Sequence, residues 1–475
     1  MMESTEDAME ARKFDWPDFL KKVAVIAVPV ALQNLLTTTG SMVDTMMISS
    51  LGKLEVGAVG LCAQFSSLMF SCYWGFVGGG MLFFSQYWGA KDDDGINRSY
   101  GLTLACMMTV AVVFFALGLF FPETVMRLYT DKEAIQRVGV DYLRIVAFAY
   151  PLMVLSMAMA SLLRCTERVT IPMYSSFAAV GVNIFLNWVL IFGHLGAPAM
   201  GVRGAALATV IAQGVGAGLI ILLAKRNGHP YLLAFRKHFR WTAALVRSYF
   251  RKCFPILMNE ILIGVGNMVI NVVLGRQPEE AIAALAVFRT LEGLIIGFFA
   301  GFSNASSILV GKEVGAGNID LAYRRAWRLV YLCQGFIAFV CAMLVVLHTP
   351  ILNMMGMSGD SFSIAFGMIL IFGVVAVIRM GNWTQNDTFR AAGDASFGTI
   401  LEIVFMWVML LPCVWLTGMV WKLPTLAVFV CCYVDEPIRY VMMQVHLFRG
   451  KWIKPVTPEG QKAMAGWRLP KRKTA

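Results

Sequence analysis

The sequence predicts an all-α integral membrane protein whose twelve transmembrane helices form two parallel six-helix repeats. Of its 475 residues, 58% are hydrophobic and only 15% are charged, and the mean hydropathy is +0.68. Such a chain has too little polar surface to coat a soluble globule. Runs of roughly 20 apolar residues, the length a helix needs to cross a hydrocarbon core of about 30 Å, recur along it. Period-two alternation of polar and apolar residues is absent, which argues against strands.

The second half of the chain repeats the first at a fixed spacing of 226 residues (255 − 29). Pro29 is matched by Pro255 and Gly75 by Gly301, without a gap between the two pairs. The same spacing joins Gly89-Ala90 to Gly315-Ala316, Arg98 to Arg324 and Arg164 to Arg390. Because each half has an even number of spans, it starts and finishes on the same side of the membrane, and the repeats are parallel. Duplicated lobes are typical of membrane transporters, where they meet at a shared substrate site near the bilayer midplane.

The expected spans follow one another along the whole chain. They begin near residues 23, 57, 99, 139, 171 and 201 in the first half, and near residues 251, 281, 327, 363, 397 and 424 in the second. These positions divide the chain into five parts. The parts are a cytoplasmic amino-terminal segment (1–22), a first lobe (23–224), a cytoplasmic linker (225–250), a second lobe (251–447) and a basic cytoplasmic tail (448–475).

Basic residues predict the orientation in the membrane. Lys and Arg resist translocation, and most of the 40 lie in segments that an inside start places in the cytoplasm, above all in the linker and the tail. Both termini are therefore expected to be cytoplasmic, in a multi-pass protein of the plasma (inner) membrane. The net charge of +11 then indicates contact with membrane lipids rather than nucleic acid, since no aromatic residues are interleaved with the basic ones. We expect a monomer.

Cysteine and histidine usage argues against an enzyme. The ten cysteines lie almost entirely inside apolar spans and lack the spacing of a metal site or a disulfide framework. The five histidines are scattered over loops and helix ends, and no two of them stand at helical spacing. The chain also lacks a G-x-x-x-x-G-K-[ST] loop for nucleotide phosphates. We therefore expect neither an enzyme nor a cofactor, nucleotide or resident metal ion.

Ionisable residues inside apolar spans are costly, and they are the first candidates for function. Asp44 lies 15 residues after Pro29, in the outer half of the first span. A low dielectric favours the neutral form of a carboxyl group, so such a residue can bind a proton or a cation and lose its charge by doing so. The alternative is an acid capped at the helix end in contact with outside water. Gln33 and Asn34 of the same span are predicted to line the substrate cavity.

The second half carries more intramembrane charge. Glu260 follows Pro255 by five residues, Glu292 lies in the eighth span, and Arg379 lies deep in the tenth. Arg289 precedes Glu292 by three residues, so the two can pair on one helix face. We assign these four charged residues to the substrate cavity, as counter-charges for a substrate or as a second protonation site. Structural ion pairs are the alternative, which is favoured for Glu292, whereas a functional role is favoured for Glu260.

Two arginines occupy equivalent places in the repeats. Arg164 follows the fourth span, and Arg390 follows the tenth within the segment TFRAAGD. We interpret both as part of cytoplasmic helix ends that are capped by Arg and Gly. This interpretation gives them no part in transport.

Several motifs occur in order along the chain. The first span is PVALQNLLTTTGSMVDTMMISSLG (29–52), and it is followed by GGGMLFFSQYWGAKD, NIFLNWVLIFG and GVRGAALAT. The second half contains SSILVGKEVGAGN, TFRAAGD and RGKWIKPVT. Together these motifs resemble the multidrug and toxic compound extrusion (MATE) family, nearer its DinF-like than its NorM-like branch. The resemblance covers about residues 20 to 455.

The resemblance implies that the two lobes form a V around a central cavity. In the family, a carboxylate at the place of Asp44 is the usual candidate for binding the coupling ion, with a helix-bending proline below it. Pro29 stands at that place, and Pro255 is its equivalent in the second half. Members of the NorM-like branch use acids in the seventh and tenth spans for Na⁺, but the register of this chain does not match them, and no role is carried over.

Polar partners of Asp44 are also implied by the resemblance. They come from the fifth and sixth spans, where Asn183 and Asn187 lie four residues apart on one helix face and Thr209 follows. Many DinF-like members have the pattern N-x-x-x-D, whereas this chain has Asn187 in place of the second acid. The cage of Asp44, Asn183, Asn187 and Thr209 can hold Na⁺, but proton binding at Asp44 is equally credible. Interhelical hydrogen bonding is the alternative role of the two asparagines.

The residues and the resemblance together predict a secondary active antiporter. It would export small organic compounds, cationic drugs or toxins above all, in exchange for H⁺ or Na⁺ as its lobes rock between two openings. A lipid-linked oligosaccharide or lipid flippase of the same superfamily is the alternative, since the scaffold is shared and only the cavity differs. A major-facilitator transporter is weakly supported, because its usual G-x-x-x-D-R-x-G-R loop is missing.

Overall fold

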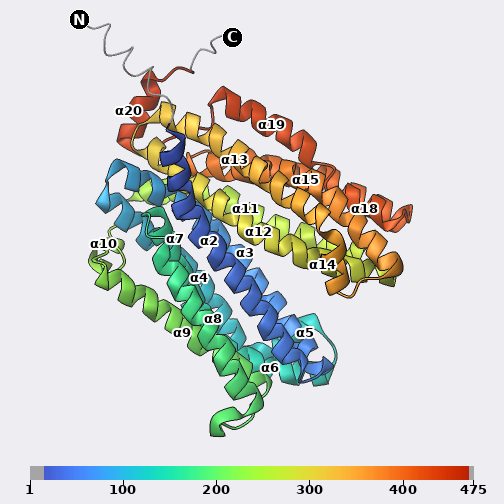
Figure 1. Cartoon of the computed structure of the whole chain (residues 1–475). Coiled ribbons are helices and arrows are strands. Elements are labelled where there is room, and N and C mark those ends of the chain that lie inside the picture. The colour runs from blue at the N-terminus through green and yellow to red at the C-terminus, as the bar shows by residue number, and fades with distance from the viewer. Residues whose placement is uncertain (1–14, 470–475) are drawn as a thin grey trace, which may run out of the picture.

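The computed structural model describes residues 15–469, and within that range the chain is almost wholly helical. An isolated bridge between Gly393 and Ile453 is the only β pairing among these residues. The helices form two lobes, which lie close together near the chain ends and spread apart away from them (Figure 1). We call the end of the molecule near the termini the terminal side and the opposite end the distal side.

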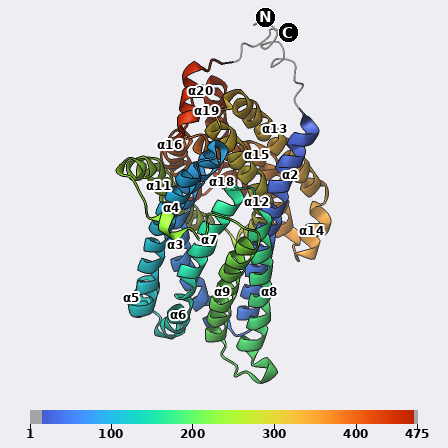
Figure 2. The ribbon, with the colours of Figure 1, turned by 90° about the vertical axis from the view of Figure 1, so that its left-hand side faces the viewer.

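The amino-terminal lobe contains the first repeat. Its helices are α2 (Trp16–Ser49), α3 (Lys53–Ala90), α4 (Asp93–Phe120), α5 (Pro122–Tyr129), α6 (Glu133–Val146), α7 (Ala149–Cys165), α8 (Thr170–Phe192) and α9 (Val202–Arg226), with a 3₁₀ turn (His194–Gly196) before α9. The axes of α6 and α7 meet at 48°, and the two together form one bent span. Figure 2 shows these helices side by side along the lobe.

The carboxyl-terminal lobe contains the second repeat, after a linker that includes α10 (Phe235–His238). Its helices are α11 (Ala243–Leu274), α12 (Glu279–Gly315), α13 (Ile319–Val346), α14 (His348–Met354), α15 (Gly359–Ala391), α16 (Phe397–Phe405), α17 (Leu411–Trp415), α18 (Thr425–Cys431) and α19 (Glu436–Arg449). Two π-helical turns (Met406–Leu410 and Leu416–Val420) extend α16 and α17 into one span. A last helix, α20 (Pro458–Gly466), lies at the terminal side (Figure 1).

The predicted spans are largely present in the structure. In residues 15–469, ten helices are long and apolar enough to cross a membrane, and the bent pair α6 and α7 is an eleventh. The twelfth span, expected from residue 424, is divided into α18 and α19. The polar residues Asp435, Glu436 and Arg439 lie at this division, which explains why it falls short of a continuous apolar helix.

The boundaries of the five expected parts differ from the helix ends by several residues. Helix α2 begins at Trp16, within the expected amino-terminal segment 1–22, whose residues 1–14 lie outside the described range. Helix α11 begins at Ala243, within the expected linker 225–250. Local caps account for both starts: the carboxylate of Asp15 accepts a hydrogen bond from the amide of Asp18, and the hydroxyl of Thr242 accepts one from the amide of Leu245.

The repeat in the sequence is also a repeat in space. Helices α12, α13, α14 and α15 each begin 226 residues after α3, α4, α5 and α6. The spacing also relates the contacts between the lobes at the terminal side. The backbone of Gly89 in α3 lies against that of Lys312 in α12, and the backbone of Gly315 lies against that of Gln86. Since Gln86 and Gly89 are the equivalents of Lys312 and Gly315, the two contacts form one pseudo-twofold pair.

The same symmetry holds deeper in the interface. Gly75 of α3 lies against the Cα atom of Leu257 in α11, and Gly301 of α12 lies against Ala27 and Ala31 in α2. Leu257 is 226 residues after Ala31, so these contacts are equivalent too. Both need glycine, because a Cβ atom at either position would overlap the partner helix. The lobes are therefore packed backbone to backbone on the terminal side, and the V opens on the distal side (Figure 1).

The carboxyl-terminal segment, which we define as residues 450–467, fastens this terminal-side contact. The side chain of Gln86 accepts a hydrogen bond from the amide of Val456 at 2.8 Å and donates one to the carbonyl of Ala391 at 2.8 Å. The hydroxyl of Thr457 donates to the carbonyl of Gly315 at 2.8 Å. One segment thus binds α3 of the first lobe and α12 of the second. Opening of the lobes on the terminal side would have to break these bonds.

A buried ion cluster holds the carboxyl-terminal segment to the loop after α15. Asp394 is 2% exposed, and its two carboxylate oxygens contact Nε2 of His446 at 3.0 Å and Nζ of Lys454 at 2.9 Å. Burial by itself raises the pKa of Asp394, but the hydrogen bonds from His446 and Lys454 outweigh it and hold the pKa below its usual value. The carboxylate therefore stabilises the folded state only where it is ionised.

We expect Asp394→Asn to lower the free energy of unfolding at pH 7 by about 1 to 3 kcal/mol, because it removes the buried carboxylate that binds His446 and the half-exposed Lys454. The contribution of the wild-type carboxylate is complete above its unfolded pKa of about 4 and is lost as pH falls through the lower folded value. The difference in unfolding temperature between wild type and variant should therefore shrink below about pH 4. Thermal unfolding in detergent at several pH values measures it, with the exposed Asp360→Asn as control.

Candidate functional site

The predicted polar residues of the first lobe come together in the structure. Nδ2 of Asn187, in α8, donates to Oδ1 of Asp44, in α2, at 2.6 Å and to Oδ1 of Asn183 at 3.3 Å. Nδ2 of Asn183 is 3.5 Å from the hydroxyl of Thr209 in α9. Asp44 is half-buried, whereas Asn187 is fully buried. The structure thus brings the four residues into one row of hydrogen bonds, in which Asn187 contacts the carboxylate of Asp44 and Asn183 and Thr209 extend the row away from it.

The chemistry of this cluster suits a small hard cation or a proton. Its oxygen donors are a carboxylate, two amide carbonyl groups and a hydroxyl, which are the ligand types that hard cations take in proteins. Oδ1 of Asn187 is buried and has no hydrogen-bond partner among the described residues. A buried acceptor without a donor is costly, and a bound cation or a proton-carrying group would satisfy it. The carboxylate supplies the single negative charge of this cluster.

Gln33 and Asn34 extend the polar surface of α2 toward the second lobe. The side-chain amide of Gln33 donates to the hydroxyl of Ser176 at 2.7 Å and accepts from the guanidinium of Arg164 at 2.8 Å. Asn34 donates to the carbonyl of Gly297 in α12 at 3.3 Å, so it bridges the lobes. Arg164 is 5% exposed. The interpretation of this arginine as a helix-end cap alone was therefore wrong, because its side chain reaches the interior.

The second lobe holds the equivalent residues with more charge. Asn259 and Glu260 of α11 are the equivalents of Gln33 and Asn34. Glu260 lies 3.6 Å from the guanidinium of Arg390, which is the equivalent of Arg164. The equivalent arginines therefore contact different positions of the repeat, because Arg164 binds Gln33, whereas Arg390 lies against Glu260, the equivalent of Asn34. The repeat is preserved while its electrostatics differ.

A small cavity between the lobes exposes this charged contact. It measures about 100 Å³ and lies between Trp74 and Met81 of α3 and the charged residues Glu260, Asp387 and Arg390 of the second lobe. Asp387 accepts a short hydrogen bond from the hydroxyl of Ser303 and lies 3.8 Å from Arg390. Two carboxylates and one guanidinium leave this cavity with an excess of negative charge when all are ionised. It would therefore attract a positively charged group.

The remaining predicted residues form one end of a buried charge network. The carboxylate of Glu292 binds Arg289 and Arg379, each at 2.7 Å. Its side chain is 4% exposed, so the predicted ion pair with Arg289 is present and Arg379 is a second partner. The guanidinium of Arg379 also lies over the rings of Trp383 and Tyr433 at 5.1 and 5.4 Å. These contacts agree with the structural alternative for Glu292.

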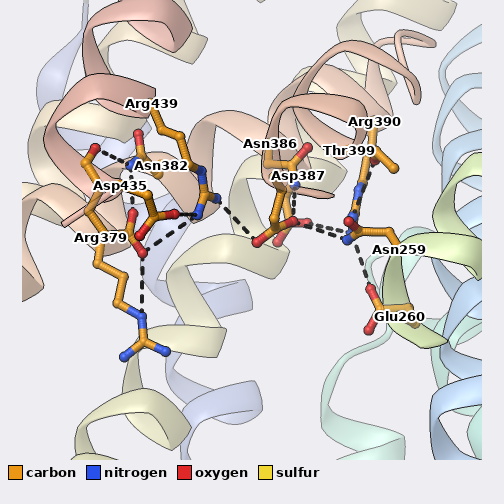
Figure 3. Close-up of polar contacts among 12 residues, drawn as sticks. Asn259, Glu260, Arg379, Asn382, Asn386, Asp387, Arg390, Thr399, Asp435 and Arg439 are labelled. Carbon is orange, nitrogen blue, oxygen red and sulfur yellow. Dashed lines mark hydrogen bonds and ion pairs between the residues drawn. The ribbon is translucent and has the colours of Figure 1, made fainter. Parts of the chain in front are cut away.

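The network continues through the divided twelfth span (Figure 3). Arg379 lies 3.7 Å from Glu436, and Arg439 contacts Glu402 at 3.2 Å and Asp435 at 3.0 Å. Two amides complete it: Asn259 and Asn386 both donate to Glu402, at 3.0 and 3.3 Å. Figure 3 shows this row of side chains leading from Arg379 toward Glu260 and Arg390. The sequence analysis did not predict four members of this network, namely Asn259, Asp435, Glu436 and Arg439. Three of them are charged residues within five positions of an expected apolar span, and that pattern could have indicated a buried ion network.

Two repeated six-helix lobes with polar groups between them define the protein as a polytopic α-helical membrane transporter. The model of the MatE family matches residues 29–189 and 255–433, and its two matches begin at Pro29 and Pro255. The chain therefore belongs to the MatE family, whose members are multidrug efflux transporters.

Known relatives agree with this assignment. The chain is 25% identical over 434 residues to "Probable multidrug resistance protein YoeA" of Bacillus subtilis, covering 90% of this chain and 93% of the relative. It is 22% identical to "Probable multidrug resistance protein NorM" of Thermotoga maritima, with coverages of 93% and 95%.

Solved structures share the fold. The outward-facing conformation of a multidrug resistance MATE family transporter has a TM-score of 0.81 at 17% identity, covering 91% of this chain and 96% of that one. A mutant of the Vibrio cholerae MATE transporter VcmN has a TM-score of 0.81 at 17% identity, with coverages of 95% and 98%. These matches confirm the predicted architecture of two lobes.

Proposed function

We propose that this member of the family is a secondary antiporter that exports organic cations in exchange for H⁺ or Na⁺ bound at Asp44. The single observation that supports it is the row of hydrogen bonds that runs from the half-buried carboxylate of Asp44 through Asn187 and Asn183 to Thr209, and so joins α2 to α8 and α9. Such a group changes its charge when it binds a cation, and the loss of charge favours a different packing of the helices around it.

The expected substrate follows from the charges between the lobes. Glu260, Asp387 and Arg390 line the cavity with two potential negative charges and one positive charge. An organic cation would complete this balance, and the aromatic face of Trp74 would pack against its apolar part. The proposed substrate is therefore a monovalent organic cation with an apolar body.

The proposed cycle uses the two openings of the V. The bias of Lys and Arg assigns the terminal side to the cytoplasm, so the distal opening faces outside. An ion that reaches Asp44 from outside favours release of the substrate in this conformation, and the lobes then rock to expose the cavity to the cytoplasm. Coupling requires only that ion and substrate favour different arrangements of the same lobes.

Dye transport in everted membrane vesicles tests the proposal. The cytoplasmic face of these vesicles points outward, so a fluorescent cationic dye is added outside and export is measured as dye uptake into the lumen, under either a pH gradient or a sodium gradient of the same size. We expect gradient-dependent dye transport with at least one of the two ions and none in vesicles without the chain. Dye transport that ignores both gradients would contradict antiport, and scrambling of a labelled lipid-linked sugar in its place would favour the flippase.

A further inference from the structure

An apolar groove lies at the seam between the lobes, and it shares no lining residue with the charged cavity at Glu260. It has a volume of about 300 Å³ and an apolar lining. Helix α2 of the first lobe forms one wall with Leu20, Ala24 and Val28, and α13 of the second lobe forms the other wall with Leu332 and Phe336. Helix α12 lies between them as the floor, through Phe298 and Phe302.

The floor of the groove is well packed, although the walls are open to the membrane. The ring of Phe336 stacks on that of Phe298 at 5.2 Å and lies 4.8 Å from that of Phe302. By contrast, Leu20 and Val28 are 43% and 49% exposed. The groove is therefore a preformed concave surface that no helix of the described chain covers. Within a bilayer its natural content is hydrocarbon.

Cationic side chains mark the terminal end of the groove. The guanidinium of Arg328 lies over the ring of Trp16 at 5.4 Å, where α13 and α2 converge. Arg328 is one helical turn from Leu332, and Trp16 is one turn from Leu20, so this pair closes the groove on the same helix faces. One turn further toward the terminal side, the exposed Arg324 forms no ion pair within residues 15–469. The groove is thus apolar along its length and ends, on the terminal side, at the basic and aromatic side chains of Arg328 and Trp16.

We propose that this groove is a binding site for one anionic phospholipid of the terminal-side leaflet. One acyl chain lies between α2 and α13 on the phenylalanine floor, and the phosphate-bearing headgroup lies at Arg324 and Arg328. The apolar lining suits the chain, and the two guanidinium groups at membrane-surface depth suit an anionic headgroup over a zwitterionic one. Trp16 suits the same depth, since its ring is apolar and its N–H is polar.

The position of the site links lipid binding to the arrangement of the lobes. One wall belongs to the first lobe, whereas the floor and the other wall belong to the second. A lipid in the groove therefore contacts both lobes as they are packed on the terminal side. If the lobes rock about this seam, the shape of the groove changes. A lipid that binds more tightly to one shape then stabilises the conformation of the lobes that has this shape. This site is independent of the proposed coupling at Asp44.

Native mass spectrometry of the purified full chain tests the site. The protein is delipidated in detergent and mixed with dioleoyl phosphatidylglycerol or dioleoyl phosphatidylcholine. We expect one phosphatidylglycerol to be retained with an affinity about tenfold above that of phosphatidylcholine. Ala24→Phe, which fills the groove, should abolish this single strong site, and Arg324→Gln combined with Arg328→Gln should remove the headgroup preference.

Matched controls distinguish the groove from the general lipid surface. Val25→Phe adds the same ring to an exposed face of α2 outside the groove, and Arg226→Gln removes an exposed arginine at another terminal-side helix end. Both should retain the lipid as wild type does. Equal retention of the two lipids by wild type would overturn the proposal, and so would full retention by a monodisperse Ala24→Phe or Leu332→Trp protein. Loss of dye binding without loss of lipid in these variants would assign the groove to the substrate and overturn it as well.

Discussion

Asp44→Asn is expected to abolish gradient-driven efflux, with a loss on the order of tenfold or more, while the protein still folds and inserts. Asparagine preserves the size of the side chain and can still contact Asn187, which donates to Asp44 at 2.6 Å. It cannot change charge, so neither H⁺ nor Na⁺ can alter the preference between the two lobe arrangements. A coupling of typical size corresponds to a factor of roughly 5 to 150. The measurement is dye transport in everted vesicles under a pH gradient and under a sodium gradient.

The control for this variant is Asp141→Asn. Asp141 is an acid of the same lobe, but it lies at the surface in an ion pair with Arg203 at 2.8 Å. Its removal should leave gradient-driven efflux near the wild-type level. If Asp44→Asn transports as well as wild type under both gradients, Asp44 is not the coupling residue, and the acids of the second lobe become the candidates. Wild-type activity together with failure of both variants would indicate a general effect of lost surface charge.

Valine at Gly89 or Gly315 is expected to abolish transport for a mechanical reason. These glycines form the pseudo-twofold contact in which α3 and α12 meet backbone to backbone on the terminal side. A side chain at either position would overlap Lys312 or Gln86, so the terminal side could not close. The helix itself should tolerate valine, whose intrinsic propensity is no worse than that of glycine. We expect loss of efflux in vesicles with normal membrane insertion.

Thiol labelling shows whether the terminal side is held open in these variants. The native Cys253 lies in the interface between the lobes, against Gly79, and is 1% exposed. Its reaction with a maleimide, followed by peptide mass spectrometry, should increase in Gly89→Val and Gly315→Val. Gly60→Val in α3 and Gly293→Val in α12 are the controls, because a Cβ atom at either would meet open space. Labelling of Cys253 at the wild-type rate in a transport-deficient Gly89→Val protein would contradict this mechanism.

The two lobes share a plan but differ in charge, and this difference suggests a division of roles. At equivalent positions, the first lobe has Gln33 and Asn34, whereas the second has Asn259 and Glu260. The first lobe surrounds a single carboxylate at Asp44 with neutral donors. The second lobe holds several acids against arginines in a buried network through Glu402 and Arg439. A lone acid is easily switched by one ion, but a network of mutual ion pairs is not.

The carboxyl-terminal segment adds a constraint to this division. Through Gln86, it binds a helix of the first lobe, and through Thr457 it binds a helix of the second. The conformation with an open distal side is thus stabilised by hydrogen bonds of the carboxyl-terminal segment as well as by the glycine contacts between α3 and α12. These bonds lie far from Asp44 along the molecule. In the proposed cycle, an ion at Asp44 would therefore act through the packing of the lobes rather than through direct contact with the segment.

Much of the architecture was predictable from the sequence, because it depends on properties that each residue carries alone. Apolar runs must be helical in a bilayer, where the backbone has to satisfy its own hydrogen bonds. The spacing between Pro29 and Pro255 predicted the repeat, and the structure places equivalent helices at that spacing. The grouping of Asp44 with Asn187 was predicted through the resemblance to a known family. The division of the twelfth span was not predicted, because its apolar flanks indicated one continuous helix. In the structure the helix is interrupted where the charged residues at its middle join the buried ion network.

The sequence alone determined the class, the number of repeats and the residues too costly to bury without a purpose. Only the tertiary structure decided which of those residues meet. The sequence predicted Arg164 to be a helix cap, whereas its guanidinium binds Gln33. Glu292 binds Arg379, which lies 87 residues away in the sequence. The groove between α2 and α13 is also invisible in the sequence. The physical reason is that helix formation and membrane insertion are local properties, whereas pairing and concavity depend on how distant helices pack.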